Sequence, residues 1–197
     1  GNSNIWLTGE HTFQEHPKNM NALMKKISLA LLTLTLLGCL GKPDAVQPVT
    51  PFALDRYLGR WYEIARLDHS FERGLDHVNA EYSLRDDGTV RVLNRGYDPA
   101  KKEWKEAEGK AQFVANNNEG YLKVSFFGPF YGSYVVFGLD QQNYQYSFIS
   151  GPDTSYLWLL ARTPTVPDAV MQQFFNEAKK AGFDTSKLIL VDQSMTT

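Results

Sequence analysis

The chain has 197 residues, a formal net charge of -2, and 43% hydrophobic and 13% aromatic residues. This length allows one domain of ordinary size together with a processed leader. The near-balance of charge leaves no basic footprint for nucleic acid and excludes strong electrostatic attraction of the folded domain to a membrane. The single cysteine, Cys39, excludes an intrachain disulfide, and the abundance of aromatic residues favours a β fold.

The amino-terminal part of the chain divides into two segments. Residues 1–19 are polar and show no sustained period, so we interpret them as a non-native or upstream extension. Residues 20–38 have the pattern of a secretory signal peptide, because the basic pair Lys25-Lys26 precedes the apolar run Ile27–Leu37. A membrane-spanning helix needs roughly twenty apolar residues, so this run predicts a cleaved leader.

The leader ends in Leu36-Leu37-Gly38-Cys39, which resembles the lipobox of bacterial lipoproteins. The resemblance implies acylation of Cys39 after cleavage, and Leu40 in place of an aspartate implies sorting to the Gram-negative outer membrane, on its periplasmic face. Two or more acyl chains attach a protein firmly to a membrane. Residues 39–52 are rich in proline, which predicts an extended tether between the anchor and the domain.

Residues 53–193 contain short strand patterns separated by turn residues, with no helix between them. Such a succession predicts hairpin connections and an eight-stranded antiparallel up-and-down barrel. The eight predicted strands are Arg60–Leu67, Val78–Leu84, Thr89–Tyr97, Trp104–Val114, Tyr121–Phe127, Ser133–Leu139, Tyr144–Ser150 and Tyr156–Arg162.

Alternation within these strands indicates that one face is apolar. In the fifth segment Leu122, Val124 and Phe126 alternate with Lys123 and Ser125. A barrel of eight such strands encloses an apolar interior, which either is filled by side chains or holds one small ligand. Periodicity alone leaves both alternatives open.

A single helix is predicted after the strands, over Pro167–Ala181, with Gly182 suited to its end. Its apolar face predicts packing on the barrel wall. The residues of that face are Val170, Met171, Phe174, Phe175 and Ala178. Leu188–Val191 is predicted to form a short final strand.

Gly59-Arg60-Trp61 matches the Gly-x-Trp motif at the start of the first strand in the lipocalin family, which this domain therefore resembles. The resemblance implies that Trp61 plugs the closed end of the barrel and that Arg162 packs over it as a cation–π pair. Gly59, Trp61 and Arg162 are accordingly predicted to form a structural lock.

Two further runs, Phe71–Leu75 and Val124–Gly132, are similar to the bacterial lipocalin branch that also resembles apolipoprotein D. This branch implies binding of a fatty acid or lysophospholipid, for lipid storage or transport in the envelope. Residues 126–131 also concentrate aromatic side chains around a Gly-Pro turn, and a homodimer through this turn is a hypothesis.

If Trp61 points inward, the family register places nine further side chains inside the barrel as candidate ligand contacts. They are Tyr82, Val92, Leu122, Val124, Phe126, Tyr134, Val136, Tyr156 and Trp158. Aromatic residues with polar tips suit an amphiphilic ligand, and Asn94 and Ser147 are candidates for further polar contacts. The alternative is that all these side chains fill a solid core.

Other chemistry is disfavoured by the sequence. Asp68, His69, Asp76 and His77 lie in the predicted first loop, but their spacing fits no tight metal motif, so no metal site is expected. The only cysteine lies at the lipobox, and no Ser-His-Asp arrangement is indicated, so no catalytic residue or cofactor is predicted. The leading hypothesis is therefore a lipid carrier, and the main alternative is a structural envelope lipoprotein with a packed, ligand-free barrel. A tetrapyrrole carrier is a further, weaker alternative.

Overall fold

The computed structural model describes residues 40–194. The predictions for residues 1–38 and for acylation of Cys39 lie outside the described residues. Within residues 40–194, no helix combines the length and the apolarity needed to span a membrane.

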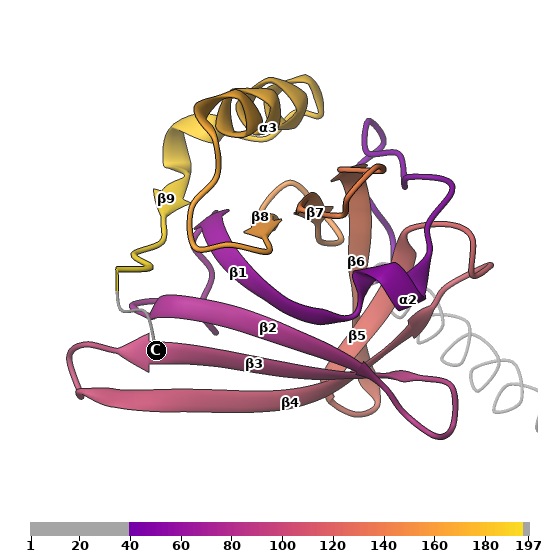
Figure 1. The fold of residues 1–197 in the computed structure, drawn as a ribbon, viewed down its shortest axis with the longest axis horizontal. Coiled ribbons are helices and arrows are strands. Elements are labelled where there is room, and N and C mark those ends of the chain that lie inside the picture. The colour runs from indigo at the N-terminus through magenta and orange to yellow at the C-terminus, as the bar shows by residue number, and fades with distance from the viewer. Residues whose placement is uncertain (1–39, 195–197) are drawn as a thin grey trace, which may run out of the picture. The chain divides into compact units, whose positions relative to one another are not determined.

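Eight antiparallel strands form a closed barrel, which confirms the predicted fold class (Figure 1). Each strand pairs with the next along the chain, and β1 pairs with both β8 and β2 to close the sheet. The strands are β1 (Gly59–Arg66), β2 (Asp76–Leu84), β3 (Val90–Asp98), β4 (Glu103–Phe113), β5 (Tyr121–Phe127), β6 (Phe130–Leu139), β7 (Tyr146–Ser150) and β8 (Leu157–Ala161). A ninth strand, β9 (Ile189–Leu190), adds to the free side of β1 beyond the barrel.

Three local differences from the sequence prediction have physical reasons. β6 begins at Phe130 rather than Ser133, because Phe127 pairs with Phe130 and closes the β5–β6 hairpin tightly. β7 begins at Tyr146 rather than Tyr144, because Tyr144 has a φ of 51° and leaves the extended conformation. The one-turn helix α2 (Leu54–Tyr57) precedes β1 and is too short for a periodic pattern to predict.

The helix α3 (Asp168–Lys180) lies against the barrel beside β7 and β8, as predicted (Figure 1). Phe174 and Ala178 are fully buried, and the ring centroids of Phe174 and Phe148 are 5.2 Å apart. Burial of a phenylalanine contributes about 1.5–3 kcal/mol, so this contact holds the helix in place. Phe175 was predicted on the same face, but it is only half-buried and does not belong to this core cluster.

The prediction of an extended tether over residues 39–52 is wrong for its described part, residues 40–52. Val46 is fully buried in the cluster of apolar side chains between α3 and the barrel wall, which includes Phe148 and Phe174. Phe52 is buried at the closed end of the barrel. The Val49 amide donates to the carbonyl of Val136 at 2.8 Å, and its carbonyl accepts from the amide of Gly120 at 2.9 Å. The prolines indicated an extended backbone, but the apolar residues between them bury that backbone against the barrel.

Candidate ligand-binding cavity

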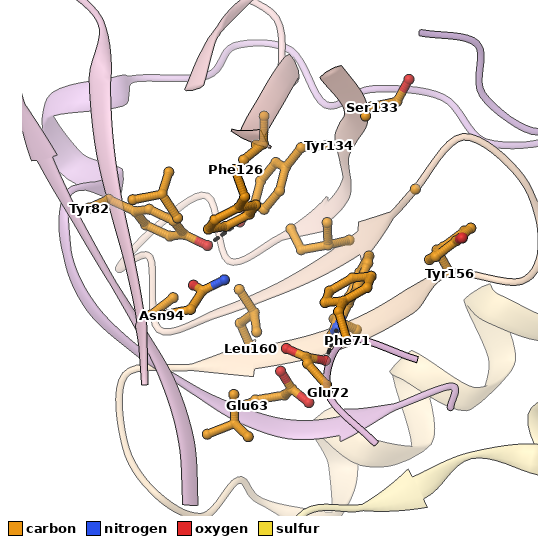
Figure 2. Close-up of a pocket in the computed structure, with 18 of the residues that line it drawn as sticks. Glu63, Phe71, Glu72, Tyr82, Asn94, Phe126, Ser133, Tyr134, Tyr156 and Leu160 are labelled. Carbon is orange, nitrogen blue, oxygen red and sulfur yellow. Dashed lines mark hydrogen bonds between the residues drawn. The ribbon is translucent and has the colours of Figure 1, made fainter. Parts of the chain in front are cut away.

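The barrel encloses a cavity of about 370 Å³, which reaches β1, β2, β3, β5, β6, β7 and β8 and the loop between β1 and β2. Small-molecule sites in proteins have volumes of about 300–1,000 Å³ and are mostly apolar with a few polar groups. The lining here fits that description, since aliphatic and aromatic side chains predominate (Figure 2). The cavity is therefore of the size and character of a small-ligand site.

Most of the predicted contact residues line this cavity. They are Tyr82, Val92, Val124, Phe126, Tyr134, Tyr156 and Trp158. Leu122 instead lines a second, much smaller cavity of about 20 Å³, and Val136 is fully buried in the closed-end core. Of the two polar candidates, Asn94 lines the main cavity and Ser147 does not.

Sequence reasoning missed several lining residues. Glu63 follows Trp61 by two positions on β1, so the strand period alone would have placed it inside. Phe71 and Glu72 also line the cavity, but they lie in the β1–β2 loop, where no period gives the direction of a side chain. The remaining missed residues are Val78, Asn79, Ala80, Tyr131, Gly132, Ser133, Ile149, Gly151, Pro152 and Leu160.

At the closed end, the Arg162 guanidinium lies 3.9 Å from the centroid of the Trp61 ring. The same guanidinium donates hydrogen bonds to the carbonyls of Arg56, Arg60 and Tyr144 at 2.8, 3.0 and 3.2 Å. The Trp61 indole donates to the carbonyl of Tyr57 at 2.8 Å. The predicted stack is therefore present, and it joins α2, β1 and the segments flanking β7 and β8.

The backbone conformation at position 59 explains why this residue is a glycine. Its φ of +97° is a conformation that residues with a side chain rarely adopt, and a Cβ there would lie 3.3 Å from an Arg162 nitrogen. Glycine thus allows the chain to turn from α2 into β1 beneath the arginine.

Above this plug, four hydroxyl groups form a chain. Tyr57 contacts the hydroxyl of Ser147 at 2.9 Å and that of Tyr134 at 2.8 Å. Tyr134 in turn contacts the hydroxyl of Tyr82 at 2.9 Å (Figure 2). Burial raises the pKa of Tyr57 to about 12 and raises the pKa values of Tyr82 and Tyr134 well above their usual range. These phenols are neutral hydrogen-bonding groups at the cavity floor.

A second polar group occupies the other side of the cavity. Arg66 donates to the Glu63 carboxyl at 3.0 Å, and the Trp158 indole donates to the Glu72 carboxylate at 3.1 Å. The His69 Nε2 lies 2.8 Å from the same Glu72 carboxylate. Glu63, Arg66, His69 and Glu72 are all buried.

The carboxyls of Glu63 and Glu72 lie beside each other at the cavity (Figure 2). Two neighbouring buried carboxyls cannot both ionise without strong repulsion, so one of them keeps a proton. Burial, together with the neighbouring Glu72, raises the pKa of Glu63 well above its usual range. Burial also acts to raise the pKa of Glu72, but the contact with His69 and the hydrogen bonds from Glu63 and Trp158 outweigh it and lower that pKa. The two directions together indicate a neutral Glu63 beside a negatively charged Glu72.

The β1–β2 loop, residues 67–75, is fixed over the cavity by this group. A second Arg66 nitrogen donates to the carbonyls of Glu72 and Leu75, both at 3.1 Å. Phe71 lines the cavity and is nevertheless 61% exposed, so it lies at the opening. The loop thus partly covers the cavity and is attached to β1 and β8 through buried polar contacts.

The β5–β6 hairpin divides its aromatic residues between the cavity and the solvent. Phe126 and Tyr131 line the cavity, whereas Phe127 and Phe130 are 81% and 72% exposed. The hairpin therefore carries an inner pair and an outer pair of aromatic rings.

The four polar residues considered for a metal do not form a site. His69 contacts Glu72, whereas His77 lies 3.9 Å from Asp192 on the carboxy-terminal segment. Among residues 40–194, no group of three histidine, cysteine or acidic side chains could hold a metal ion.

Comparison with known proteins places this geometry in context. The lipocalin-like domain family matches residues 52–193. The chain is similar to the "Outer membrane lipoprotein Blc" of Vibrio cholerae, with 62% identity over 86% of this chain and 99% of that protein. It is also similar to the "Outer membrane lipoprotein Blc" of Escherichia coli, with 53% identity over 77% of this chain and 85% of that protein.

More distant similarity extends to animals. Apolipoprotein D of Mus musculus is 30% identical over 79% of this chain and 84% of its own length. The solved structure of insecticyanin from Manduca sexta matches with a TM-score of 0.61 at 22% identity, covering 77% of this chain and 86% of that chain. At that identity the match supports the barrel fold and nothing finer.

Proposed function

Because the chain belongs to the lipocalin-like family, among the bacterial outer membrane lipoproteins, we propose that its barrel binds and carries a single-chain lipid, a fatty acid or a lysophospholipid. The observation that carries this proposal is the cavity of about 370 Å³ enclosed by mostly apolar side chains. The packed-barrel alternative requires no such cavity, so the structure favours the carrier.

Burial of an alkyl chain supplies the binding free energy. Each methylene group transferred from water contributes about 0.8 kcal/mol, which is set against the cost of immobilising the ligand. Val92, Val124 and Phe126 offer apolar surface to such a chain, while the hydroxyls of Tyr82 and Tyr134 offer polar contacts. A site of this kind suits an amphiphile.

Attachment to the membrane keeps the barrel near its lipids. We propose acylation at Cys39, on the periplasmic face of the outer membrane. The residue that follows, Leu40, lies against β5, because its carbonyl accepts a hydrogen bond from the Tyr121 hydroxyl. The folded domain therefore begins directly after the proposed anchor, with no extended spacer in residues 40–52.

The family indicates binding or transport, and we extend this to the absence of catalysis. Among the described residues that line the cavity there is no cysteine, histidine or lysine to act as nucleophile or base. The proposal therefore includes no chemical step.

Native mass spectrometry of the purified chain, followed by lipid extraction, tests the carrier function. A stoichiometric adduct with the mass of a fatty acid or a lysophospholipid is expected. The protein should include residues 40–52, because Val46 and Phe52 are part of the core. A bare mass, together with failure to take up added lysophospholipid, would overturn the proposal.

A matched pair of variants locates the ligand. Ala80→Phe places a ring in the cavity lining, whereas Ala107→Phe adds the same ring to an exposed position on β4. Ala80→Phe is expected to abolish the lipid adduct, and Ala107→Phe to leave it unchanged. Equal adducts in both variants would place the ligand outside the barrel.

A homodimer through the β5–β6 hairpin is a further proposal, which the exposed rings of Phe127 and Phe130 support. Sedimentation of the chain and of Phe127→Ser tests it. A dimer that dissociates in the variant is expected, and a monomer in both proteins would contradict it.

A further inference from the structure

The polar groups that line the cavity have an uneven charge pattern. The lining includes two carboxyl groups, Glu63 and Glu72, and two amides, Asn79 and Asn94. Of the described residues, no lysine, arginine or histidine lines it. A carboxylate placed next to Glu63 and Glu72 would lose its hydration and meet a like charge, which is unfavourable on both counts.

We propose that the Glu63–Glu72 pair is a binding point for a protonated amine, so that the cavity accepts single-chain cationic amphiphiles. The inference rests on the proposed function, because it assigns a further ligand class to the same cavity.

The surrounding contacts fix both carboxyls in place. Arg66 from β1 holds Glu63 at 3.0 Å, while Trp158 from β8 and His69 from the β1–β2 loop contact Glu72 at 3.1 and 2.8 Å. Arg66 and His69 do not line the cavity, so they orient the carboxyls from behind. The Arg66 guanidinium, 4.0 Å from the Glu72 carboxylate, balances that charge in the free protein. The binding point is therefore formed before any ligand arrives.

The charge of the site is balanced with and without the ligand. In the free protein Glu63 is neutral beside an ionised Glu72, because burial and that neighbouring charge raise the pKa of Glu63. When an ammonium group lies against both carboxyls, the Glu63 proton passes to the solvent, and no covalent bond forms or breaks. The ligand's positive charge replaces the proton, and its N–H groups donate to the two carboxylates.

The rest of the cavity suits such a ligand. The Asn94 side chain points into the cavity and makes no hydrogen bond to any described residue, so it is free to contact a polar ligand group (Figure 2). The other ionisable side chains that line the cavity are Tyr82, Tyr131, Tyr134 and Tyr156. Burial raises the pKa values of Tyr82 and Tyr134, and both carboxylates raise that of Tyr82 further. Tyr82 is therefore a neutral hydroxyl and does not compete for the amine.

Titration calorimetry with three ligands of one chain length tests the inference. Dodecylamine, dodecanol and dodecanoate differ only in the polar group, and the amine is protonated at neutral pH. The protein is the full chain carrying Cys39→Ser, so that no acyl chain of its own competes for the cavity. Repeating each titration in buffers of different protonation enthalpy gives the number of protons released on binding.

Two variants separate recognition from folding. Glu63→Gln retains the shape and neutrality of the protonated side chain but has no proton to release. Glu81→Gln makes the same change at an exposed position on β2, where Glu81 forms an ion pair with the exposed Arg60. Unfolding midpoints of both variants show whether the barrel is intact.

The expected result is that dodecylamine binds about tenfold or more tightly than dodecanol, the gain typical of a hydrogen bond to a charged group, and that dodecanoate binds weakest. Amine binding should release about one proton per ligand and should strengthen as the pH rises toward the Glu63 pKa. In Glu63→Gln the amine should lose its advantage and its proton release, whereas Glu81→Gln should behave as the parent chain.

Dodecanoate binding as tightly as dodecylamine at neutral pH would overturn the inference and leave the lipid carrier intact. Proton release that persists in Glu63→Gln would do the same. Failure of all three ligands to bind would overturn the carrier function itself.

Discussion

The two ends of the barrel use buried polar groups in opposite ways. At the closed end, the Arg162 guanidinium lies 3.9 Å from the centroid of the Trp61 ring and donates hydrogen bonds to the neighbouring backbone carbonyls. At the open end, the buried carboxyls of Glu63 and Glu72 line a cavity of about 370 Å³. A polar group placed for stability has its partners within the protein, whereas a polar group beside an empty cavity has capacity left for a ligand.

The largest effect is expected from removing the plug. Trp61→Ala deletes a fully buried indole. Truncation of a large buried aromatic residue to alanine lowers the free energy of unfolding by about 3–5 kcal/mol. Denaturant unfolding measures the change. If the two ends differ as described, Trp158→Ala at the cavity should destabilise the protein less, because the indole there is only half-buried. Equal losses of unfolding free energy in the two variants would contradict the proposed difference between the two ends of the barrel.

Arg162→Ala should have the next largest effect, a loss of about 2–4 kcal/mol, because three carbonyls and an indole face lose their partner. Arg162→Lys keeps the charge but cannot donate to three carbonyls from a planar group, so it should recover only part of the loss. Full recovery by lysine would show that charge alone, and not the stacked geometry, is responsible.

The hydroxyl chain gives a graded test at the cavity floor. Tyr134 contacts two hydroxyls and Tyr82 contacts one, so Tyr134→Phe should cost about 1–2 kcal/mol and Tyr82→Phe about 0.5–1 kcal/mol. Thermal unfolding of both variants measures the order. The reverse order would mean that the Tyr82 hydroxyl contributes more to stability than the Tyr134 hydroxyl does.

The pH dependence of stability should distinguish the open end from the closed end. Because the pKa of Glu63 is raised in the folded protein, the native state holds a proton that the unfolded chain releases above about pH 4.3. Stability should therefore fall as the pH rises from that value toward the folded pKa of Glu63. In Glu63→Gln this fall should disappear, and Arg162→Lys should retain it. A fall that is unchanged in Glu63→Gln would assign it to other groups.

The sequence predicted the closed end better than the open end, for a physical reason. Gly59, Trp61 and Arg162 lie on strands or beside them, where register and family resemblance together specify their contacts. The cavity depends equally on Phe71 and Glu72, which a loop brings over the barrel, and no local pattern gives the direction of a loop side chain.

The volume of the cavity inside the barrel also could not be predicted from the sequence. The period places Leu122, Val124 and Phe126 on one face, but whether facing side chains meet or leave a space depends on packing across the whole barrel. The structure shows both outcomes, since Leu122 lies beside only a small space and Val124 lies at the main cavity. The prediction of a tether over the proline-rich segment was wrong for a similar reason, because Val46 is buried through tertiary contacts that no local pattern specifies.

The central claim is that ligand enters the open end and leaves the closed end untouched. The two indole N–H groups report these regions separately, because that of Trp61 donates to the Tyr57 carbonyl and that of Trp158 to the Glu72 carboxylate. Nuclear magnetic resonance of ¹⁵N-labelled protein titrated with lysophospholipid follows both signals. The account predicts a large shift for Trp158 and almost none for Trp61. A shift of Trp61 with Trp158 unchanged, or no shift of either, would contradict it.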